Sequence, residues 1–265
     1  MDPINGNRIE YCIKSTDHPA NLGKTLYAFH GMGGSANEMC DKLTADTQAF
    51  ETHGSIFHVI CPSFGPYWVI HEAGLKESFA RFRSVVEQQY SMSADQKSVL
   101  YGESMGGFNV LKVSGSTDSD SIQFQKAVAA CPAVFSQRLP TRVLGSLLPA
   151  SVFGEFDRDT SISIIQDSPY FDVTNRHPEL LIMPNQDDFI GCARFQVLGM
   201  SVVTLGGIYQ GAVDFHRELL KRGQVSKIQV LPILCNKNVK SYDRHKQGSY
   251  YCIFLSLLDT RSYSC

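Results

Sequence analysis

The stretch Val99–Gly107 reads VLYGESMGG, a short apolar run that leads directly into the pattern Gly-x-Ser-x-Gly. This pattern predicts a sharp turn between a buried strand and a helix, with Ser104 at its tip. A Cβ atom at Gly102 or Gly106 would collide where strand and helix pack closely around the turn. Ser104 is therefore a candidate nucleophile at the carboxyl edge of a sheet; the alternative is an ordinary strand-to-helix turn that needs small residues.

Apolar runs that suit strands alternate with helical stretches along most of the chain. The expected strands are Leu26–His30, Ile56–Cys61, Val99–Gly102, Ala127–Cys131, Leu180–Pro184 and Ile228–Leu234. The expected helices are Glu72–Tyr90, Met105–Val113 and Ala212–Arg222; in the first, Leu75, Phe79, Phe82, Val85 and Val86 recur near period 3.6. The alternation predicts an α/β fold with a mostly parallel central sheet flanked by helices.

The 265 residues show no repeat and no break in composition, which favours a single domain over residues 1–265. The interval 132–178 contains no strand of comparable strength. So long an excursion from a compact sheet usually covers something, and this one leaves the sheet near the edge where Ser104 is expected. We therefore predict that residues 132–178 form an inserted cap.

Charge and composition exclude several classes of partner. The formal net charge is -2 and the isoelectric point is about 6.4, so neither nucleic acid nor an acidic membrane surface is an expected partner. No stretch is apolar enough to span a membrane, and the first residues lack the pattern of an export signal. The eight cysteines are scattered without a Cys-x-x-Cys pair, which favours mostly reduced core residues and a cytoplasmic protein.

A glycine-rich turn, His30–Ser35 (HGMGGS), follows the first expected strand. Backbone N–H groups of such a turn can stabilise the oxyanion that forms during acyl transfer. The same stretch fits the dinucleotide fingerprint Gly-x-Gly-x-x-Ala, but the next strand ends in Cys61-Pro62-Ser63 without the carboxylate that would bind a ribose. The oxyanion interpretation fits better, so no cofactor is expected, and no metal-site spacing appears.

An activated serine needs a histidine to take its proton and a carboxylate to orient that histidine. Asp187 and Asp188 follow the strand Leu180–Pro184 and would lie at the same edge as Ser104. Two histidines come later in the chain. His216 falls inside an expected helix, where a surface or half-buried role is more common, whereas His245 follows the last expected strand and is the candidate base.

Several segments together resemble the α/β-hydrolase superfamily and, within it, the esterase D family of S-formylglutathione hydrolases and related carboxylesterases. The matching segments are His30–Gly34, Phe64–Trp68, Gly102–Gly107, Ser168–Tyr170 and Gln186–Ile190. The resemblance implies that the acid is Asp188, which directly precedes Phe189 and an aliphatic residue. It also implies that the backbone N–H groups of Met32 and Met105 are the oxyanion donors.

These observations predict a serine hydrolase that cleaves an ester or thioester of a small molecule through Ser104, His245 and Asp188. Gly31, Gly33 and Trp68 are expected at the substrate pocket, although Trp68 also suits an aromatic cluster in the core. An acyltransferase or a peptidase would use the same triad. A binding protein that keeps the fold without turnover is the alternative from a different class.

Overall fold

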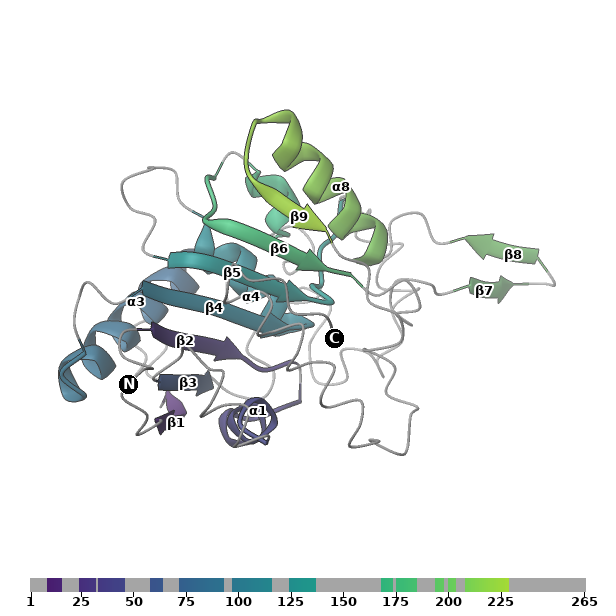
Figure 1. Ribbon diagram of the computed structural model, residues 1–265. Coiled ribbons are helices and arrows are strands. Elements are labelled where there is room, and N and C mark those ends of the chain that lie inside the picture. Colours follow the sequence, from purple (N-terminus) through teal and green to yellow (C-terminus); the bar gives the residue numbers. More distant parts are fainter. Residues whose placement is uncertain are drawn as a thin grey trace.

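The computed structural model describes residues 9–15, 24–31, 33–45, 58–63, 72–92, 97–115, 124–136, 168–173, 175–184, 194–197, 200–203 and 208–228. Seven strands in these ranges form one sheet in the order β1-β3-β2-β4-β5-β6-β9 (Figure 1). Their bounds are Glu10–Ser15 (β1), Lys24–Phe29 (β2), His58–Ser63 (β3), Lys97–Glu103 (β4), Phe124–Ala130 (β5), Glu179–Met183 (β6) and Ser226–Ile228 (β9). All neighbouring strands are parallel except β1 and β3, which confirms the predicted α/β class with a mostly parallel sheet.

The helices that accompany the sheet are α1 (Ala36–Leu43), α3 (Glu72–Gln89), α4 (Met105–Ser114), α8 (Ile208–Lys221) and the short 3-10 helix η3 (Pro169–Asp172). A separate antiparallel pair, β7 (Arg194–Val197) and β8 (Met200–Val203), lies away from the large sheet in Figure 1.

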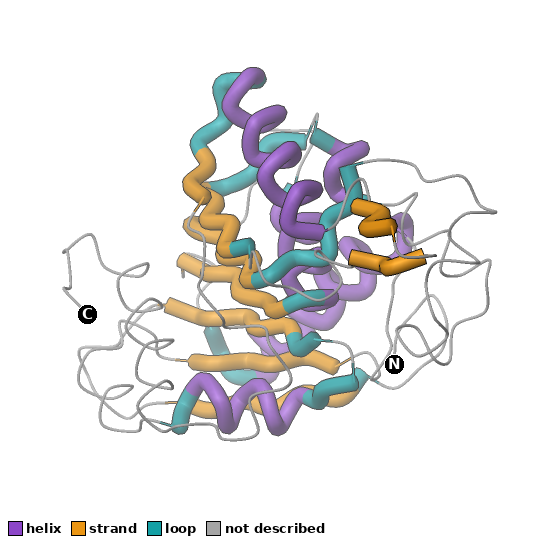
Figure 2. Tube along the Cα trace, turned by 90° about the vertical axis from the view of Figure 1, so that its right-hand side faces the viewer, coloured by secondary structure: helices purple, strands orange, loops and turns teal. Residues whose placement is uncertain are grey.

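Successive side chains of a strand point to opposite faces of a sheet, and here each face has its own apolar core. On β2, Tyr27 and Phe29 face the core that α3, α4 and α8 cover. Leu26 and Ala28 face the other core, to which α1 contributes Met39 and Cys40. Figure 2 shows α1 apart from the longer helices, at the lower end of the stacked strands.

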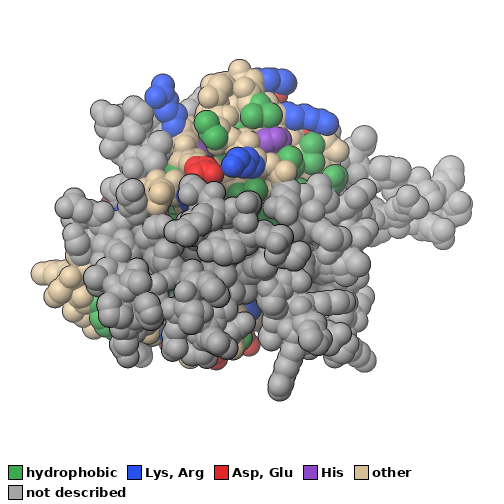
Figure 3. All heavy atoms as spheres, in the orientation of Figure 1, with side chains coloured by type: hydrophobic (Ala, Val, Ile, Leu, Met, Phe, Trp, Pro, Cys, Tyr) green, Lys and Arg blue, Asp and Glu red, His purple; other side chains and the backbone are tan. Residues whose placement is uncertain are grey.

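Helix α8 shows clearly how the alternation of apolar and polar residues fixes the face that packs. Phe215 and Leu219 are fully buried against the sheet. Arg217 and Lys221 lie outside and form ion pairs with acidic residues one turn earlier in the same helix. In Figure 3 basic side chains gather at the top of the molecule, over α8 and β9.

Some elements differ from the sequence-based expectation. Strand β1, helix α1 and the β7–β8 pair were not predicted. Val85 was expected on the packed face of α3 but is 61% exposed, because it falls beyond the stripe that Phe79, Phe82 and Val86 bury. The predicted strand Ile228–Leu234 corresponds to β9, which begins earlier, at Ser226, and whose continuation past Ile228 lies outside the described residues. Most of the predicted cap, residues 137–167, also lies outside them.

The cysteine prediction holds only in part. Cys12, Cys40 and Cys61 are free, and all three border the core under α1. Cys131, directly after β5, forms a disulfide bond and is the exception among the described cysteines. Within the described part of the chain, no helix has the length and apolar character needed to cross a membrane.

Candidate active site

Ser104 forms the sharp turn that the sequence predicts. It stands between the end of β4 at Glu103 and the start of α4 at Met105, with φ 55° and ψ -114°. A residue with a side chain adopts this conformation at a cost of about 1–3 kcal/mol, and keeps it only where the surrounding structure imposes it. Such strain is typical of functional positions, which makes Ser104 the starting point of the site.

The two motif glycines permit the close packing around this turn. A Cβ atom at Gly106 would lie 2.2 Å from the carbonyl oxygen of Phe29 in β2. A Cβ atom at Gly102 would lie 2.2 Å from the carbonyl oxygen of Gly106. Both distances are far below van der Waals contact, so strand and helix approach as closely as they do only because these residues lack side chains.

Backbone hydrogen bonds join the turn at Ser104 to β5, to the residues after β5 and to α4. The N–H of Ser104 donates to the carbonyl of Ala130 at the end of β5 (2.8 Å), and its own carbonyl accepts from Phe108 and Ala133. Met105 is the first residue of α4, and the first N–H groups of a helix have no partner inside it. This end of the helix favours negative charge, as the predicted oxyanion role of Met105 requires.

The glycine-rich turn after β2 lies directly against Ser104. A Cβ atom at Gly31 would be 3.5 Å from the Cβ atom of Ser104. The N–H of Gly34 donates to the carbonyl of Gly31 (3.1 Å), and Gly33 has a left-handed φ of 77°. Met32, the second predicted oxyanion donor, lies outside the described residues.

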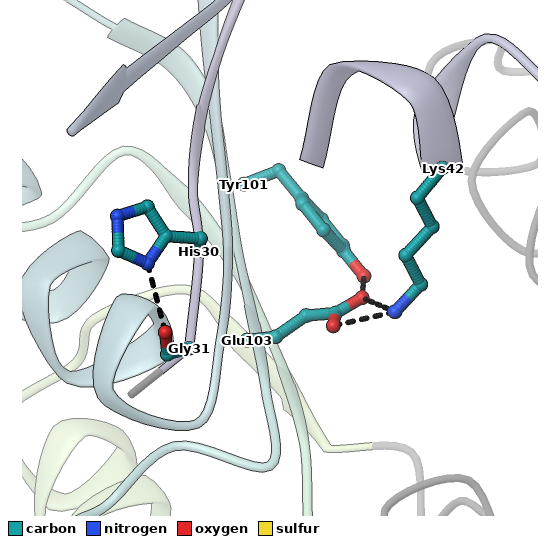
Figure 4. Close-up of polar contacts among 5 residues, drawn as sticks. All are labelled: His30, Gly31, Lys42, Tyr101 and Glu103. Carbon is teal, nitrogen blue, oxygen red and sulfur yellow. Dashed lines mark hydrogen bonds and ion pairs between the residues drawn. The ribbon is translucent and has the colours of Figure 1, made fainter. Parts of the chain in front are cut away.

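His30 stabilises this turn through both of its ring nitrogens. Its Nδ1 lies 2.8 Å from the carbonyl oxygen of Gly31 and therefore carries the proton, because a carbonyl only accepts (Figure 4). Its Nε2 then accepts from the hydroxyl of Ser63 at 3.0 Å. Burial, with only 2% of the residue exposed, lowers the pKa of His30, so the imidazole is neutral at pH 7.

An ion pair that the sequence analysis did not identify lies beside the nucleophile. The Nζ atom of Lys42, on α1, is 2.6 Å from both carboxylate oxygens of Glu103 (Figure 4). The hydroxyl of Tyr101 donates to one of these oxygens at 2.5 Å. The motif Ser35-x-x-Glu38 was a usable signal for α1, since the Ser35 hydroxyl caps the helix by accepting from the N–H of Glu38.

For the remaining predicted site residues, the structure describes only the strands that precede them in the sequence. Strand β6 ends at Met183, whose carbonyl accepts from the N–H of Cys131 (2.8 Å) at the same edge of the sheet as Ser104. The two candidate acids come shortly after this strand in sequence. The described ranges do not include Asp187, Asp188, Trp68 or His245.

The other described histidines lie at the opposite edge of the sheet. His216 bonds to Ser226, the first residue of β9 (2.9 Å), which agrees with the half-buried role expected for it. His58 is the first residue of β3, and His177 precedes β6. Among the histidines that the structure describes, His30 alone lies at the edge that carries Ser104. The described ranges also contain no cluster of His, Cys, Asp or Glu able to hold a metal ion.

Comparisons with known proteins identify solved structures with a similar fold. No family model and no curated protein sequence matches the chain. Many solved structures do match. The fluorophosphonate-binding serine hydrolase FphF from Staphylococcus aureus is 16% identical over 94% of this chain and 92% of its own, with a TM-score of 0.57.

Two further structures are similar over almost their whole length. The S-formylglutathione hydrolase FrmB from Staphylococcus aureus is 16% identical, with a TM-score of 0.56, over 95% of this chain and 100% of its own. LpqC, a poly(3-hydroxybutyrate) depolymerase from Bordetella parapertussis, is 13% identical, with a TM-score of 0.61, over 100% of this chain and 88% of its own. At these identities the similarity establishes the fold.

Proposed function

We propose that this chain, which has the α/β-hydrolase fold, is a serine hydrolase that cleaves carboxylic ester or thioester bonds of small molecules. The observation that carries the proposal is the left-handed Ser104, raised between β4 and α4 with the glycine turn against its side chain. Strain of this kind is retained where it exposes a nucleophile.

In the proposed mechanism, the hydroxyl oxygen of Ser104 attacks the carbonyl carbon while His245 takes the hydroxyl proton. Asp188 orients the imidazole and stabilises its cation. The backbone N–H groups of Met32 and Met105 stabilise the oxyanion. His245 then passes the proton to the leaving alcohol or thiol, and water, deprotonated by the same histidine, releases the acyl group from Ser104.

The positions of the other histidines support His245 as the base. Of the two histidines that follow the candidate acids, His216 lies at the amino edge of the sheet and bonds to Ser226. His30 lies at the correct edge, but both of its ring nitrogens already bond within the glycine turn and to Ser63. With these two engaged elsewhere, His245 is the base that the triad order favours.

The substrate pocket is proposed to include Gly31, Gly33 and Trp68, beneath a cap formed by residues 132–178 of a single domain. The ester preference is supported by the names of the compared structures, an S-formylglutathione hydrolase and a poly(3-hydroxybutyrate) depolymerase. A peptidase or an acyltransferase would use the same groups. Product analysis with competing water, amine and alcohol acceptors separates these activities.

The test is intact-mass labelling with a fluorophosphonate probe. We expect one adduct on the wild type, none on Ser104→Ala, and labelling of His245→Ala slowed about 10²–10⁴-fold, because the serine loses its base. Two matched controls are expected to label like the wild type. Ser91→Ala removes another left-handed serine, and His216→Ala removes the alternative histidine.

Three outcomes would contradict parts of the proposal. A folded but unlabelled wild type would overturn the serine hydrolase and favour a binding protein on the same fold. An adduct that persists on Ser104→Ala would assign the nucleophile elsewhere. Loss of labelling in His216→Ala but not in His245→Ala would show that His216, and not His245, is the catalytic base.

A further inference from the structure

The ion pair of Lys42 with Glu103 joins the two parts of the proposed catalytic site. Glu103 directly precedes Ser104, and Lys42 lies on α1, the helix that follows the glycine turn. The side chains are 26% and 23% exposed, and Tyr101 adds a third polar group to the cluster. The pair is thus partly shielded from water, where opposite charges attract more strongly than on an open surface.

The backbone around Glu103 explains why a side-chain link is useful there. The ladder between β4 and β2 ends with the pair Gly102 and Phe29. The ladder between β4 and β5 continues one residue further, through Glu103 and Ala130. The paired part of β4 thus ends one residue earlier on the β2 side than on the β5 side, and Lys42 contacts the Glu103 side chain from α1 beyond that end.

With this ion pair, a series of short contacts connects β2, the glycine turn, α1 and the end of β4 in a closed loop. Strand β2 leads into the glycine turn, and the side chain of Ser35 joins that turn to α1 as its cap. Helix α1 carries Lys42 to Glu103, the neighbour of Ser104. Gly31 completes this closed loop, because a Cβ atom there would be 3.4 Å from the carbonyl oxygen of Glu103.

On the basis of the proposed function, we propose that Lys42 and Glu103 are positioning residues that set the placement of Ser104 relative to the oxyanion turn. Neither group touches the reacting carbonyl. Their effect is on the geometry of attack, where a displacement of about 1 Å costs about 100-fold in rate. The ion pair should therefore raise kcat and the rate of phosphonylation while leaving KM almost unchanged.

The experiment compares kcat and KM for p-nitrophenyl acetate with the second-order rate of fluorophosphonate labelling. Lys42→Met and Glu103→Gln are each expected to lower kcat and the labelling rate at least tenfold, with KM within about twofold of the wild type. Lys42→Arg keeps the charge and is expected to stay within about threefold of the wild type. Circular dichroism and thermal melting establish that each variant is folded.

Lys14→Met is the matched control. Lys14 also forms a 2.6 Å ion pair between the sheet and α1, with Asp41, but that pair is remote from Glu103 and more exposed, at 39% and 70%. We expect kcat and the labelling rate of this variant to equal those of the wild type. If Lys14→Met lost as much activity as Lys42→Met, the effect would come from docking of α1 in general, and the positioning role would be wrong.

Each remaining outcome bears on one proposal or the other. A labelled wild type together with a folded Lys42→Met that keeps the wild-type rate would overturn the positioning role and leave the serine hydrolase intact. An unlabelled wild type would overturn both. If Lys42→Met does not fold, Tyr101→Phe decides: it removes one hydroxyl from the cluster, and a kcat less than twofold below that of the wild type would overturn the inference.

Discussion

At the scale of single residues, the conformation of Ser104 depends on the absence of side chains at Gly102 and Gly106. The strained φ of 55° persists because Gly106 lets α4 lie against the carbonyl oxygen of Phe29, and because Gly102 lets the helix pass over the strand. Both requirements are steric and follow from the sharp turn of the motif, although the atom that Gly106 must clear belongs to β2. The stored strain is thus a property of the packing around Ser104.

This packing predicts a large loss of stability in Gly106→Ala. The new methyl group would be 2.2 Å from a backbone oxygen that cannot rotate away, so strand or helix must shift, at a cost of about 1–3 kcal/mol. Urea denaturation measures the loss. Gly223→Asn is the control, because Gly223 is left-handed with open space around it and Asn tolerates that conformation within about 1 kcal/mol. Equal losses would contradict the steric explanation.

The link from Lys42 to Glu103 was not predictable in the same way. The two residues are 61 positions apart, and only the parallel pairing of β2 with β4 brings them together. A charged residue in a short polar helix is usually solvated, so nothing in the local pattern distinguishes Lys42 from its neighbours. The nucleophile was therefore predictable from local sequence, whereas its side-chain support depends on tertiary structure.

At the scale of elements, the accuracy of the sequence prediction follows burial. The central strands β2, β4, β5 and β6 are apolar because both faces of the sheet are covered, and each was expected close to where it lies. Strand β1 is at one end of the sheet and mixes Glu10 and Lys14 with apolar residues, so it lacks that signal.

Helix α8 permits a direct test of this account with two adjacent leucines. Leu219 is fully buried against the sheet, whereas Leu220 is 51% exposed. We expect Leu219→Ala to lower the free energy of unfolding by about 2–5 kcal/mol, because it leaves a cavity in the core. Leu220→Ala is expected to change it by less than about 0.5 kcal/mol. Similar losses in the two variants, measured in urea, would show that α8 packs on another face.

At the scale of the whole molecule, stability should depend on pH through three histidines. Burial lowers the pKa values of His30, His58 and His216 below their ordinary value. In the unfolded chain these residues take up protons as the pH falls through about 6.5, whereas in the folded protein they still resist protonation. Stability is therefore fully present above this pH and is lost as the pH falls below it.

Thermal melting between pH 7.5 and 5.5 measures this dependence. We expect the Tm to fall across that range, and to fall less steeply in His216→Gln, which no longer has a shifted imidazole at this position. A Tm that is constant or rises toward pH 5.5 would contradict the contribution of the buried histidines.

The order of strands in the sheet also has a consequence for synthesis of the chain. Strand β2 pairs with β4 at the centre of the sheet, where Lys24 lies beside Lys97, so a newly made β2 has no such partner until the chain has grown past residue 97. Strand β3 is made in between, and with β1 and α1 it assembles from nearer parts of the chain. Since long loops must close before central strands pair, refolding is expected to be slow relative to that of helical proteins of this size. During synthesis, the edge of β2 that pairs with β4 therefore stays unpaired while more of the chain is made than for the corresponding edge of any later central strand.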